Sequence, residues 1–564
     1  MRRKINGFVA GLAAWCALGF AGPSSAAEVD LIVSNGVIYD GSGAAPVKGG
    51  VAVKDGRVVA IGELRGYTSA RTVDARGLAV APGFINTLSW AVDSLIHDGR
   101  GMSELKQGVT LEIFGEGNSY GPVNDTIRDE MLKTQGDIRY DVTWTTLAEY
   151  LDFLVARGVS PNVASFVGAT TVRAHEIGFA DRAPSAAELA KMQELVRAAM
   201  RDGALGVGSS LIYAPASYAK TDELVALAKA AGEYGGAYIS HMRSEGDRFL
   251  EALDELIHIA REAKVNAQVY HLKAAGERNW PKMRQAIGRI EAARAQGLHI
   301  TADMYTYTAG ATGLDAAMPP WVQEGGIDQW IARLKDPAIR QRVLREMRDP
   351  AAEWESLLMS AGSPERVLVI GFKNEKLKPL TGKTLAEVAK LRGVSAEDAA
   401  IGLVIEDGSR VSTAYFLMSE ENVKLGLTQP WVSIDSDAEA QAPEGPFLLS
   451  NPHPRAYGSF ARFLGKYVRE EKVTTLQDAI RRLTQLPAQT FKLESRGCLA
   501  PKCHADIVVF DPATIRDHAT FEKPHQYATG VAHVFVNGVQ VLKDGEHTGA
   551  KPGQVVRGPG YGKK

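Results

Sequence analysis

Short apolar runs alternate with longer amphipathic stretches through the middle of the chain. Eight runs are rich in β-forming residues, at 83–88, 109–114, 163–168, 204–210, 236–241, 266–271, 298–303 and 431–437. Most are separated by stretches with helical spacing of apolar residues, such as 186–202, 221–234, 248–263 and 281–296. Strands that alternate with helices build parallel sheets, and eight repeats favour a closed barrel. We therefore expect an α/β fold with a (β/α)8 TIM-like barrel over 83–490, carrying a helical insertion at about 328–427.

The two ends of the chain share a different pattern. Val, Ile and Leu alternate there with polar residues, and Asn-Gly and Asp-Gly pairs interrupt the runs, as at 29–36 and 531–538. Such pairs between alternating apolar runs indicate β-hairpins. We predict that residues 28–82 and 491–564 form the two halves of one small β-sandwich domain, with the barrel inserted between them.

The first residues have the pattern of an export signal. Arg2, Arg3 and Lys4 precede an apolar stretch at 8–20, and small residues follow at 24–27. This order is typical of a signal peptide, and the apolar stretch is short for a membrane span. We predict a signal peptide at 1–27 and a periplasmic or secreted protein without membrane attachment after cleavage; an uncleaved membrane anchor is the alternative.

Composition and charge narrow the functional classes. The chain has 564 residues, with 64 Lys and Arg against 66 Asp and Glu, so its net charge of −2 provides no basic field for nucleic acid. Three Cys are too few for a disulfide scaffold. In an oxidising compartment Cys498 and Cys503 could still form a local disulfide. The 12 His could supply a metal site.

Candidate catalytic groups follow the predicted strands. In chain order, these ends carry Glu116, Tyr213, His241, His271, Asp303, Asp435 and Asp437. In a parallel barrel the carboxyl ends of the strands meet on one face, where active sites lie. Two His from adjacent strands and a carboxylate from a third suit a catalytic zinc, because three protein ligands leave a position for water. A single His after a strand is more often structural, but two in succession favour a metal site.

Several motifs together resemble one family. They are Ala-Pro-Gly-Phe-Ile at 81–85, Ser-His-Met-Arg-Ser-Glu-Gly at 240–246, Tyr-His-Leu-Lys at 270–273, Thr-Ala-Asp-Met-Tyr at 301–305, Pro-His-Pro-Arg at 452–455 and Asp-Gly-Glu-His-Thr-Gly-Ala at 544–550. Over nearly the whole chain after residue 27, this set resembles the amidohydrolase superfamily, and within it the N-acyl-D-amino-acid deacylases, or D-aminoacylases. The motifs at 240–246 and 452–455 are the most specific to this branch.

The resemblance implies a barrel capped by a β-sandwich and an enzyme that hydrolyses an amide with metal-activated water. It makes His241 and His271 zinc ligands and Asp437 the general acid and base; Asp435 is the rival for that role, and Asp303 is expected to be structural.

The resemblance also implies how the substrate is held. Arg455 is similar to the residue that pairs with the substrate carboxylate, which a bidentate guanidinium suits. Tyr213 and Lys273 match positions that hold the substrate and its carbonyl end, and His453 is expected to orient Arg455. The implied partner is a small-molecule substrate carrying a carboxylate.

Two departures from the family change the expected metal site. Leu88 and Trp90 occupy the positions of the usual His-x-His after the first strand, and neither can bind a metal. The bridging Cys of the second strand is also absent; Glu116 is the nearest replacement, although Gly117 could be the strict equivalent. A carboxylate is a competent zinc ligand. We therefore expect one zinc ion per chain, bound by Glu116, His241 and His271.

The expected reaction is hydrolysis of an N-acyl-D-amino acid to a carboxylate and a D-amino acid. Two alternatives stay open. A dipeptidase, a lactonase or a hydrolase of foreign amides would keep this chemistry with another substrate, because Leu88 and Trp90 must reshape the pocket. A non-catalytic binding protein derived from the scaffold would explain the lost His pair, but not the retention of the other site residues.

Overall fold

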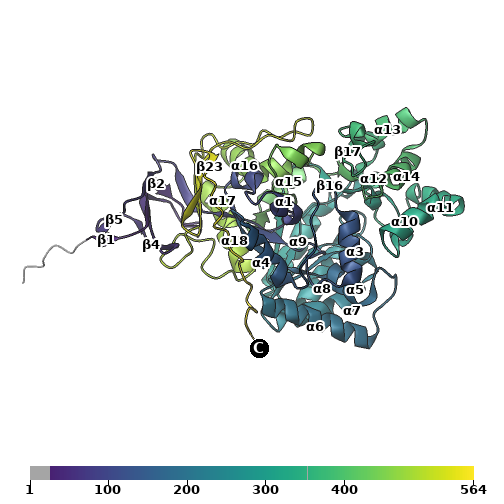
Figure 1. Ribbon diagram of the computed structural model, residues 1–564, viewed down its shortest axis with the longest axis horizontal. Coiled ribbons are helices and arrows are strands. Elements are labelled where there is room, and N and C mark those ends of the chain that lie inside the picture. The colour runs from purple at the N-terminus through teal and green to yellow at the C-terminus, as the bar shows by residue number, and fades with distance from the viewer. Residues whose placement is uncertain (1–25, 352–353, 564) are drawn as a thin grey trace, which may run out of the picture.

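The computed structural model describes residues 26–351 and 354–563 (Figure 1). The predicted signal peptide lies outside these described residues, apart from its last two positions. Within the described ranges, no helix has the length and apolar character required to cross a bilayer. The molecule is elongated in Figure 1, with a β domain at one end, a barrel in the centre and a helix-rich insertion at the other end.

A ring of parallel strands forms the centre. Its members are β8 (Phe84–Asn86), β9 (Val109–Phe114), β10 (Asn162–Ser165) with β11 (Val167–Gly168), β12 (Gly206–Ser210), β13 (Ala237–His241), β14 (Ala267–Val269), β15 (Ile300–Met304) and β19 (Val432–Ile434). The last strand meets the first where the amide of Asp437 donates to the carbonyl oxygen of Leu88 at 3.0 Å. These strands lie where the hydrophobic runs predicted them, and the expected α/β barrel is confirmed.

Helices cover the outside of this ring. They are α1 (Val92–His97), α2 (Met102–Leu105), α3 (Asp125–Thr134), α4 (Leu147–Arg157), α5 (Ala169–Ile177), α6 (Ala186–Asp202), α7 (Thr221–Gly232), α8 (Phe249–Ala263), α9 (Lys282–Ala295), α15 (Glu420–Leu427), α16 (Arg455–Arg462), α17 (Leu476–Leu483) and α18 (Gln485–Thr490). Local sequence sets their ends: α6 begins with a capping box between Ser185 and Glu188 and stops at Gly203, which adopts a left-handed conformation.

An insertion follows the seventh barrel strand. Its antiparallel sheet contains β16 (Gly310–Gly313), β18 (Ser412–Tyr415) and β17 (Val367–Gly371) in this order, and its helices are α10 (Ile327–Lys335), α11 (Pro337–Met347), α12 (Leu357–Ala361), α13 (Leu385–Arg392) and α14 (Ala396–Asp407). We expected a helical insertion starting at about residue 328, so the strands and the earlier start are corrections. Gly-Ala-Thr-Gly at 310–313 lacks the apolar alternation that identifies a strand.

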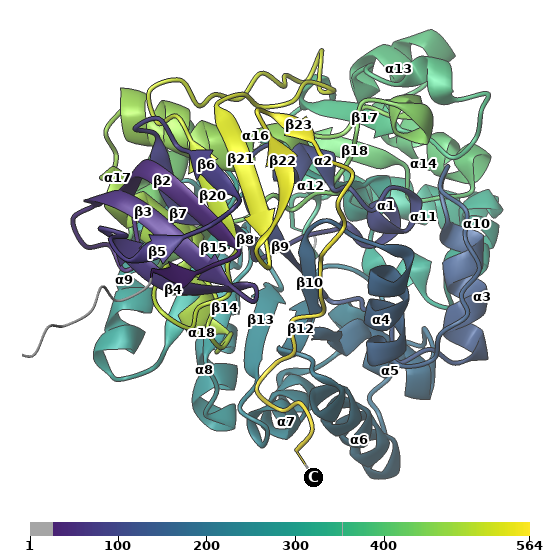
Figure 2. The same cartoon turned by 60° about the vertical axis from the view of Figure 1, so that its left-hand side comes forward.

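Both chain ends build the remaining domain. A nine-stranded sheet joins β2 (Leu31–Ile38), β3 (Val47–Lys54), β4 (Arg57–Gly62), β6 (Thr72–Asp74) and β7 (Ala79–Pro82) to β20 (Ile507–Phe510), β21 (Val531–Val536), β22 (Val539–Lys543) and β23 (Glu546–His547). The two halves meet where β7 and β20 pair antiparallel, seen as the purple and yellow strands of Figure 2. A short pair, β1 (Ala27–Glu28) with β5 (Tyr67–Thr68), lies beside it. The predicted β-sandwich from both termini is confirmed, and Cys498 and Cys503 form a disulfide.

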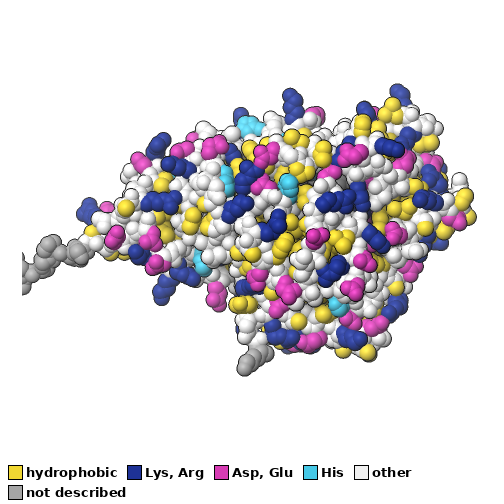
Figure 3. All heavy atoms as spheres, in the orientation of Figure 1, with side chains coloured by type: hydrophobic (Ala, Val, Ile, Leu, Met, Phe, Trp, Pro, Cys, Tyr) yellow, Lys and Arg dark blue, Asp and Glu magenta, His cyan; other side chains and the backbone are white. Residues whose placement is uncertain are grey.

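The surface agrees with the near-zero net charge. On the face seen in Figure 3, basic and acidic side chains are interspersed among the coloured residues, and neither sign covers a continuous area there.

Candidate active site

A cavity of about 700 Å³ opens at the carboxyl ends of the barrel strands. The barrel lines it with Trp90, Glu116, Tyr213, His241, His271, Lys273, Asp437 and Arg455, and the insertion with Thr312 and Arg410. All residues that we predicted for catalysis, substrate binding and metal binding line this one cavity. The convergence follows from the topology, since parallel strands bring residues from distant parts of the sequence to the same end of the barrel.

Three electron-pair donors meet at the base of the cavity. Nδ1 of His241 lies 2.9 Å from Nε2 of His271 and 3.2 Å from Oε1 of Glu116, and the remaining distance, from His271 Nε2 to Glu116 Oε1, is 3.3 Å. All three side chains are buried, with 5%, 2% and 6% of His241, His271 and Glu116 exposed. Among the described residues, this Glu–His–His group is the cluster that could hold a metal ion.

The spacing fits zinc. Ligand atoms about 2.0–2.1 Å from a tetrahedral zinc ion lie about 3.3 Å apart, close to the three distances observed here. Imidazole nitrogen and carboxylate oxygen are both zinc ligands. The donor set, its spacing and its burial therefore match a site for one zinc ion held by Glu116, His241 and His271.

Two glycines place Glu116 in the site. Gly115 and Gly117 have φ angles of 108° and 71°, a region that other residues rarely adopt. A Cβ atom at Gly115 would lie 2.5 Å from the carbonyl oxygen of Phe166, and one at Gly117 would lie 2.6 Å from the Cβ of Ser210. The Gly-Glu-Gly sequence thus turns the chain sharply after β9 and projects the carboxylate of Glu116 toward the His pair, so Glu116 rather than Gly117 is the candidate ligand.

A buried carboxylate lies behind both His side chains and contacts one of them, His271, closely. Glu245 Oε1 lies 3.0 Å from Nδ1 of His271, and its Oε2 lies 3.9 Å from Nε2 of His241. A His that binds metal through one nitrogen carries its proton on the other, and a carboxylate there fixes the ring and its tautomer. Glu245 therefore favours the His271 tautomer that leaves the lone pair of Nε2 facing Glu116, against the Lys273 ammonium, whose Nζ also lies 2.8 Å from His271 Nδ1. The distance to His241 Nε2 is too long for a hydrogen bond, and that nitrogen has no hydrogen-bond partner among the described residues.

Lys273 belongs to this supporting layer. Its Nζ donates to Glu245 Oε1 at 2.6 Å and to the carbonyl oxygen of His271 at 3.0 Å. Burial lowers the pKa of Lys273, but the neighbouring Glu245 carboxylate raises this pKa by more, to above its usual value. The side chain therefore stays an ammonium ion. We expected Lys273 to hold the substrate; the structure shows its ammonium group paired with Glu245.

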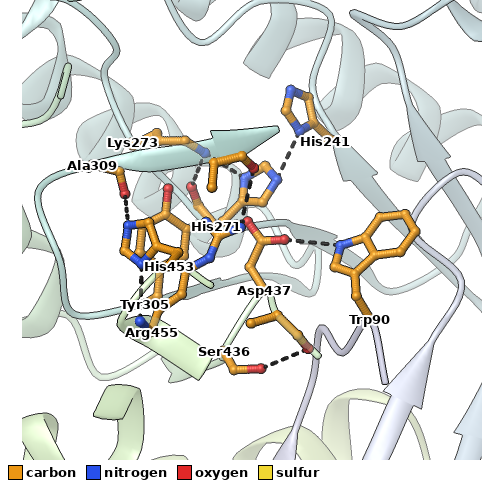
Figure 4. Close-up of polar contacts among 12 residues, drawn as sticks. Trp90, His241, His271, Lys273, Tyr305, Ala309, Ser436, Asp437, His453 and Arg455 are labelled. Carbon is orange, nitrogen blue, oxygen red and sulfur yellow. Dashed lines mark hydrogen bonds and ion pairs between the residues drawn. The ribbon is translucent and has the colours of Figure 1, made fainter. Parts of the chain in front are cut away.

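Asp437 lies at the end of the last barrel strand, with a φ of 46°. Its Oδ2 forms an ion pair with Nη1 of Arg455 at 2.8 Å, and its Oδ1 accepts a hydrogen bond from the indole nitrogen of Trp90 at 3.1 Å (Figure 4). Burial raises the pKa of Asp437, against the opposing effect of the Arg455 guanidinium. The rival Asp435 does not line the cavity; its carboxylate is buried without a hydrogen-bond partner among the described residues.

Arg455 retains donors for a ligand. Its backbone amide donates to Nδ1 of His453 at 3.0 Å, while His453 Nε2 contacts the carbonyl oxygen of Ala309 at 3.0 Å. Within the described structure, Nε and Nη1 of Arg455 are buried without an aligned acceptor, although Nη1 lies close to Asp437. Burial of unsatisfied donors is costly, so these N–H groups favour an anionic ligand in the cavity. His453 is placed to orient Arg455.

The remaining predicted residues occupy different places. The Tyr213 ring lies 5.3 Å from the His241 ring and under the guanidinium of Arg410, at 4.8 Å. Asp303 supports the site from below, where its Oδ1 accepts the backbone amide of His271 at 2.6 Å. Sequence reasoning left Glu245 and Arg410 without a role. The position of Glu245 in the motif at 240–246 was a usable signal, whereas nothing in the sequence indicated Arg410.

Comparisons with known proteins agree with this geometry. The model of the amidohydrolase family matches residues 71–542. The D-aminoacylase of Alcaligenes xylosoxydans xylosoxydans is 32% identical over 537 residues, covering 94% of this chain and 98% of that protein. An N-acyl-D-aspartate deacylase from the same organism is also 32% identical, over 94% and 95% of the two chains.

Solved structures give the same result. An N-acyl-D-glutamate deacylase from Bordetella bronchiseptica, complexed with zinc and a phosphonate inhibitor, superposes with a TM-score of 0.77 at 30% identity, over 94% of this chain and all of that one. A D-aminoacylase structure concerned with a binuclear metal centre, one-metal activation and second-metal attenuation gives 0.78 at 31% identity, with the same coverage.

Proposed function

Since the chain belongs to the amidohydrolase family, we propose that it hydrolyses the amide bond of an N-acyl-D-amino acid to give a carboxylate and a free D-amino acid. The observation that carries this proposal is the buried group of Glu116, His241 and His271 in one cavity with Asp437 and Arg455. The D-aminoacylase and the deacylases for acidic D-amino acids reported above support the substrate class.

The metal site defines where the amide reacts. Zinc bound by Glu116, His241 and His271 supplies a Lewis acid, which polarises a carbonyl group and makes water more acidic. The three side chains come from the ends of barrel strands, and Glu245 contacts His271, so the site is arranged before substrate binds and little reorganisation accompanies the reaction.

Arg455 and Asp437 provide binding and proton transfer. The free donors of Arg455 pair with the α-carboxylate of the substrate and orient the amide toward the Glu–His–His group. The Asp437 carboxylate takes a proton from the attacking water and returns it to the leaving nitrogen as the C–N bond breaks. The ion pair between these two residues couples substrate binding to the position of the proton carrier.

The location of the protein is also a proposal. The basic, apolar and small residues at 1–27 support export to the periplasm or beyond. An exported amide hydrolase would meet N-acyl amino acids and D-amino-acid compounds outside the cytoplasm.

The test is a screen with purified, zinc-loaded protein, using matched N-acetyl-D- and N-acetyl-L-amino acids and dipeptides, with release of the free amine as the signal. We expect turnover of the D-compounds. Asp437→Asn should lower kcat by about 10²- to 10⁴-fold, since it removes the proton carrier. Activity confined to L-compounds, dipeptides or esters would overturn the deacylase proposal.

A further inference from the structure

Trp90 makes an unusual double contact beside the metal-ligand group. Its indole Nε1 lies 3.0 Å from Oε2 of Glu116 and 3.1 Å from Oδ1 of Asp437. One N–H therefore serves two carboxylates that come from opposite ends of the barrel sequence, after β9 and after β19. Figure 4 shows the indole nitrogen directed at Asp437.

Because of this contact, the two oxygens of the Glu116 carboxylate have different partners. Oε1 faces His241 and His271, while Oε2 faces the indole of Trp90. The carboxylate is thereby held with one oxygen free to bind a metal and the other occupied by a neutral donor. Hydrogen bonds to a charged acceptor are stronger than those between neutral groups.

The backbone holds Trp90 and Asp437 together as well. The amide of Trp90 donates to the carbonyl oxygen of Ala438 at 2.9 Å, and the amide of Asp437 donates to the carbonyl oxygen of Leu88 at 3.0 Å. These two bonds close the barrel between its first and last strands. The indole N–H and its acceptor on Asp437 are therefore fixed relative to each other by main-chain geometry.

We infer that Trp90 is a positioning residue that takes the place of a second metal ion between Glu116 and Asp437. A cation there would use the same two oxygens that the indole N–H now occupies. It would also need further ligands, and the neighbouring buried side chain, Leu88, offers none. The inference rests on the proposed function, and it explains how two carboxylates stay ordered in a chain with one metal site.

The geometry separates this site from the binuclear centre reported for a related D-aminoacylase. Leu88 and Trp90 stand at the two positions where the family pattern has His-x-His. Leu88 belongs to a buried hydrophobic cluster against which Trp90 packs, so the two side chains lie in the same region beside Glu116, and two ligating side chains there could complete a second site. Trp90 prevents this in two ways, because its ring fills the space and its N–H uses the carboxylate oxygens.

The experiment compares three proteins: the parent, Trp90→Phe and the double variant Leu88→His with Trp90→His. Zinc per chain is measured on metal-stripped protein by titration with zinc and by elemental analysis. We expect one zinc for the parent and for Trp90→Phe, and two for the double variant. This measurement needs no substrate, so it decides the inference even when the substrate proposal fails. Two tightly bound zinc ions in the parent, or one in a folded double variant, would overturn it.

Kinetics test the positioning role. Trp90→Phe keeps an aromatic ring but removes the N–H, and we expect kcat to fall about 10- to 100-fold with KM changed less than about 3-fold. Trp321→Phe is the matched control. It also removes an indole N–H that donates to a carboxylate, that of Glu346 at 2.7 Å, but Trp321 is not one of the described residues that line the cavity. An unchanged kcat in Trp90→Phe, or an equal loss in the control, would contradict the role. Circular dichroism of each variant verifies that it folds.

Discussion

The buried carboxylate of Glu245 is expected to control how tightly the His pair binds zinc. It faces the nitrogen atoms of His241 and His271 that point away from Glu116, and it forms an ion pair with Lys273 at 2.6 Å. Glu245→Gln keeps the size of the side chain but removes its charge. The variant therefore weakens two separate interactions, the close contact with His271 and the ion pair with Lys273.

The two effects have different magnitudes. Loss of a carboxylate that supports a metal-binding His typically costs 10- to 100-fold in metal affinity, or about 1.4–2.7 kcal/mol. Removal of one partner from a buried ion pair costs about 3–5 kcal/mol of folding stability, because the other charge stays buried without compensation. Only 7% of Lys273 and 3% of Glu245 is exposed, so the full penalty is expected for this pair.

The assay measures zinc affinity by competition with a chelator and stability by urea unfolding of the metal-free protein. Glu223→Gln is the matched control, since Glu223 and Arg173 form an equally buried pair at 2.6 Å, and neither belongs to the described cavity wall. Both variants should lose stability, but only Glu245→Gln should lose zinc affinity. Wild-type zinc affinity in Glu245→Gln, or an equal affinity loss in Glu223→Gln, would refute the reasoning.

Two further predictions concern pH. Burial raises the pKa of Asp437, and a base acts only when it is deprotonated, so the acid limb of the kcat/KM profile should lie above the usual pKa of 3.8. Arg455→Gln should move this limb further upward, because it removes the positive charge that lowers the pKa. An acid limb at or below pH 3.8 would contradict the prediction. Burial also raises the pKa of Glu355 to about 7, from 4.5, so its contribution to stability is complete below pH 4.5 and is lost as the pH rises through about 7. Urea unfolding of Glu355→Gln across this range should show a smaller decline, by no more than about 3 kcal/mol, and an unchanged slope would exclude Glu355 as its source.

The sequence predicted the architecture because the signals for barrel strands are local. Apolar runs of strand length, separated by helical stretches, located β13 and β14, and parallel topology then brought His241 and His271 to one face. The same reasoning failed for β16, whose four residues include two glycines and carry no alternation. That strand is defined by its pairing with β18, a contact that is distant in sequence and leaves no local pattern.

The functional site, like the fold, could be predicted from the sequence only in part. Candidate metal ligands could be chosen from the sequence, because residue type limits which side chains can bind zinc, and the structure brings Glu116, His241 and His271 together. The roles of Glu245 and Trp90 could not be predicted, because they depend on where a side chain points. The sequence indicated that Trp90 removes a ligand and reshapes the pocket, but not that its N–H contacts both Glu116 and Asp437, as it does in the structure.

The charges of the site provide an independent reason for one metal ion. Side-chain contacts connect three carboxylates, on Glu116, Glu245 and Asp437, with two cations, on Lys273 and Arg455, and the two His rings are neutral when they act as ligands. This described network thus has one negative charge in excess. Buried charge is costly unless it is compensated. One divalent ion together with one substrate carboxylate makes the occupied site neutral, whereas a second divalent ion would leave two positive charges without partners. A neutral indole N–H between Glu116 and Asp437 orders both carboxylates without adding that charge.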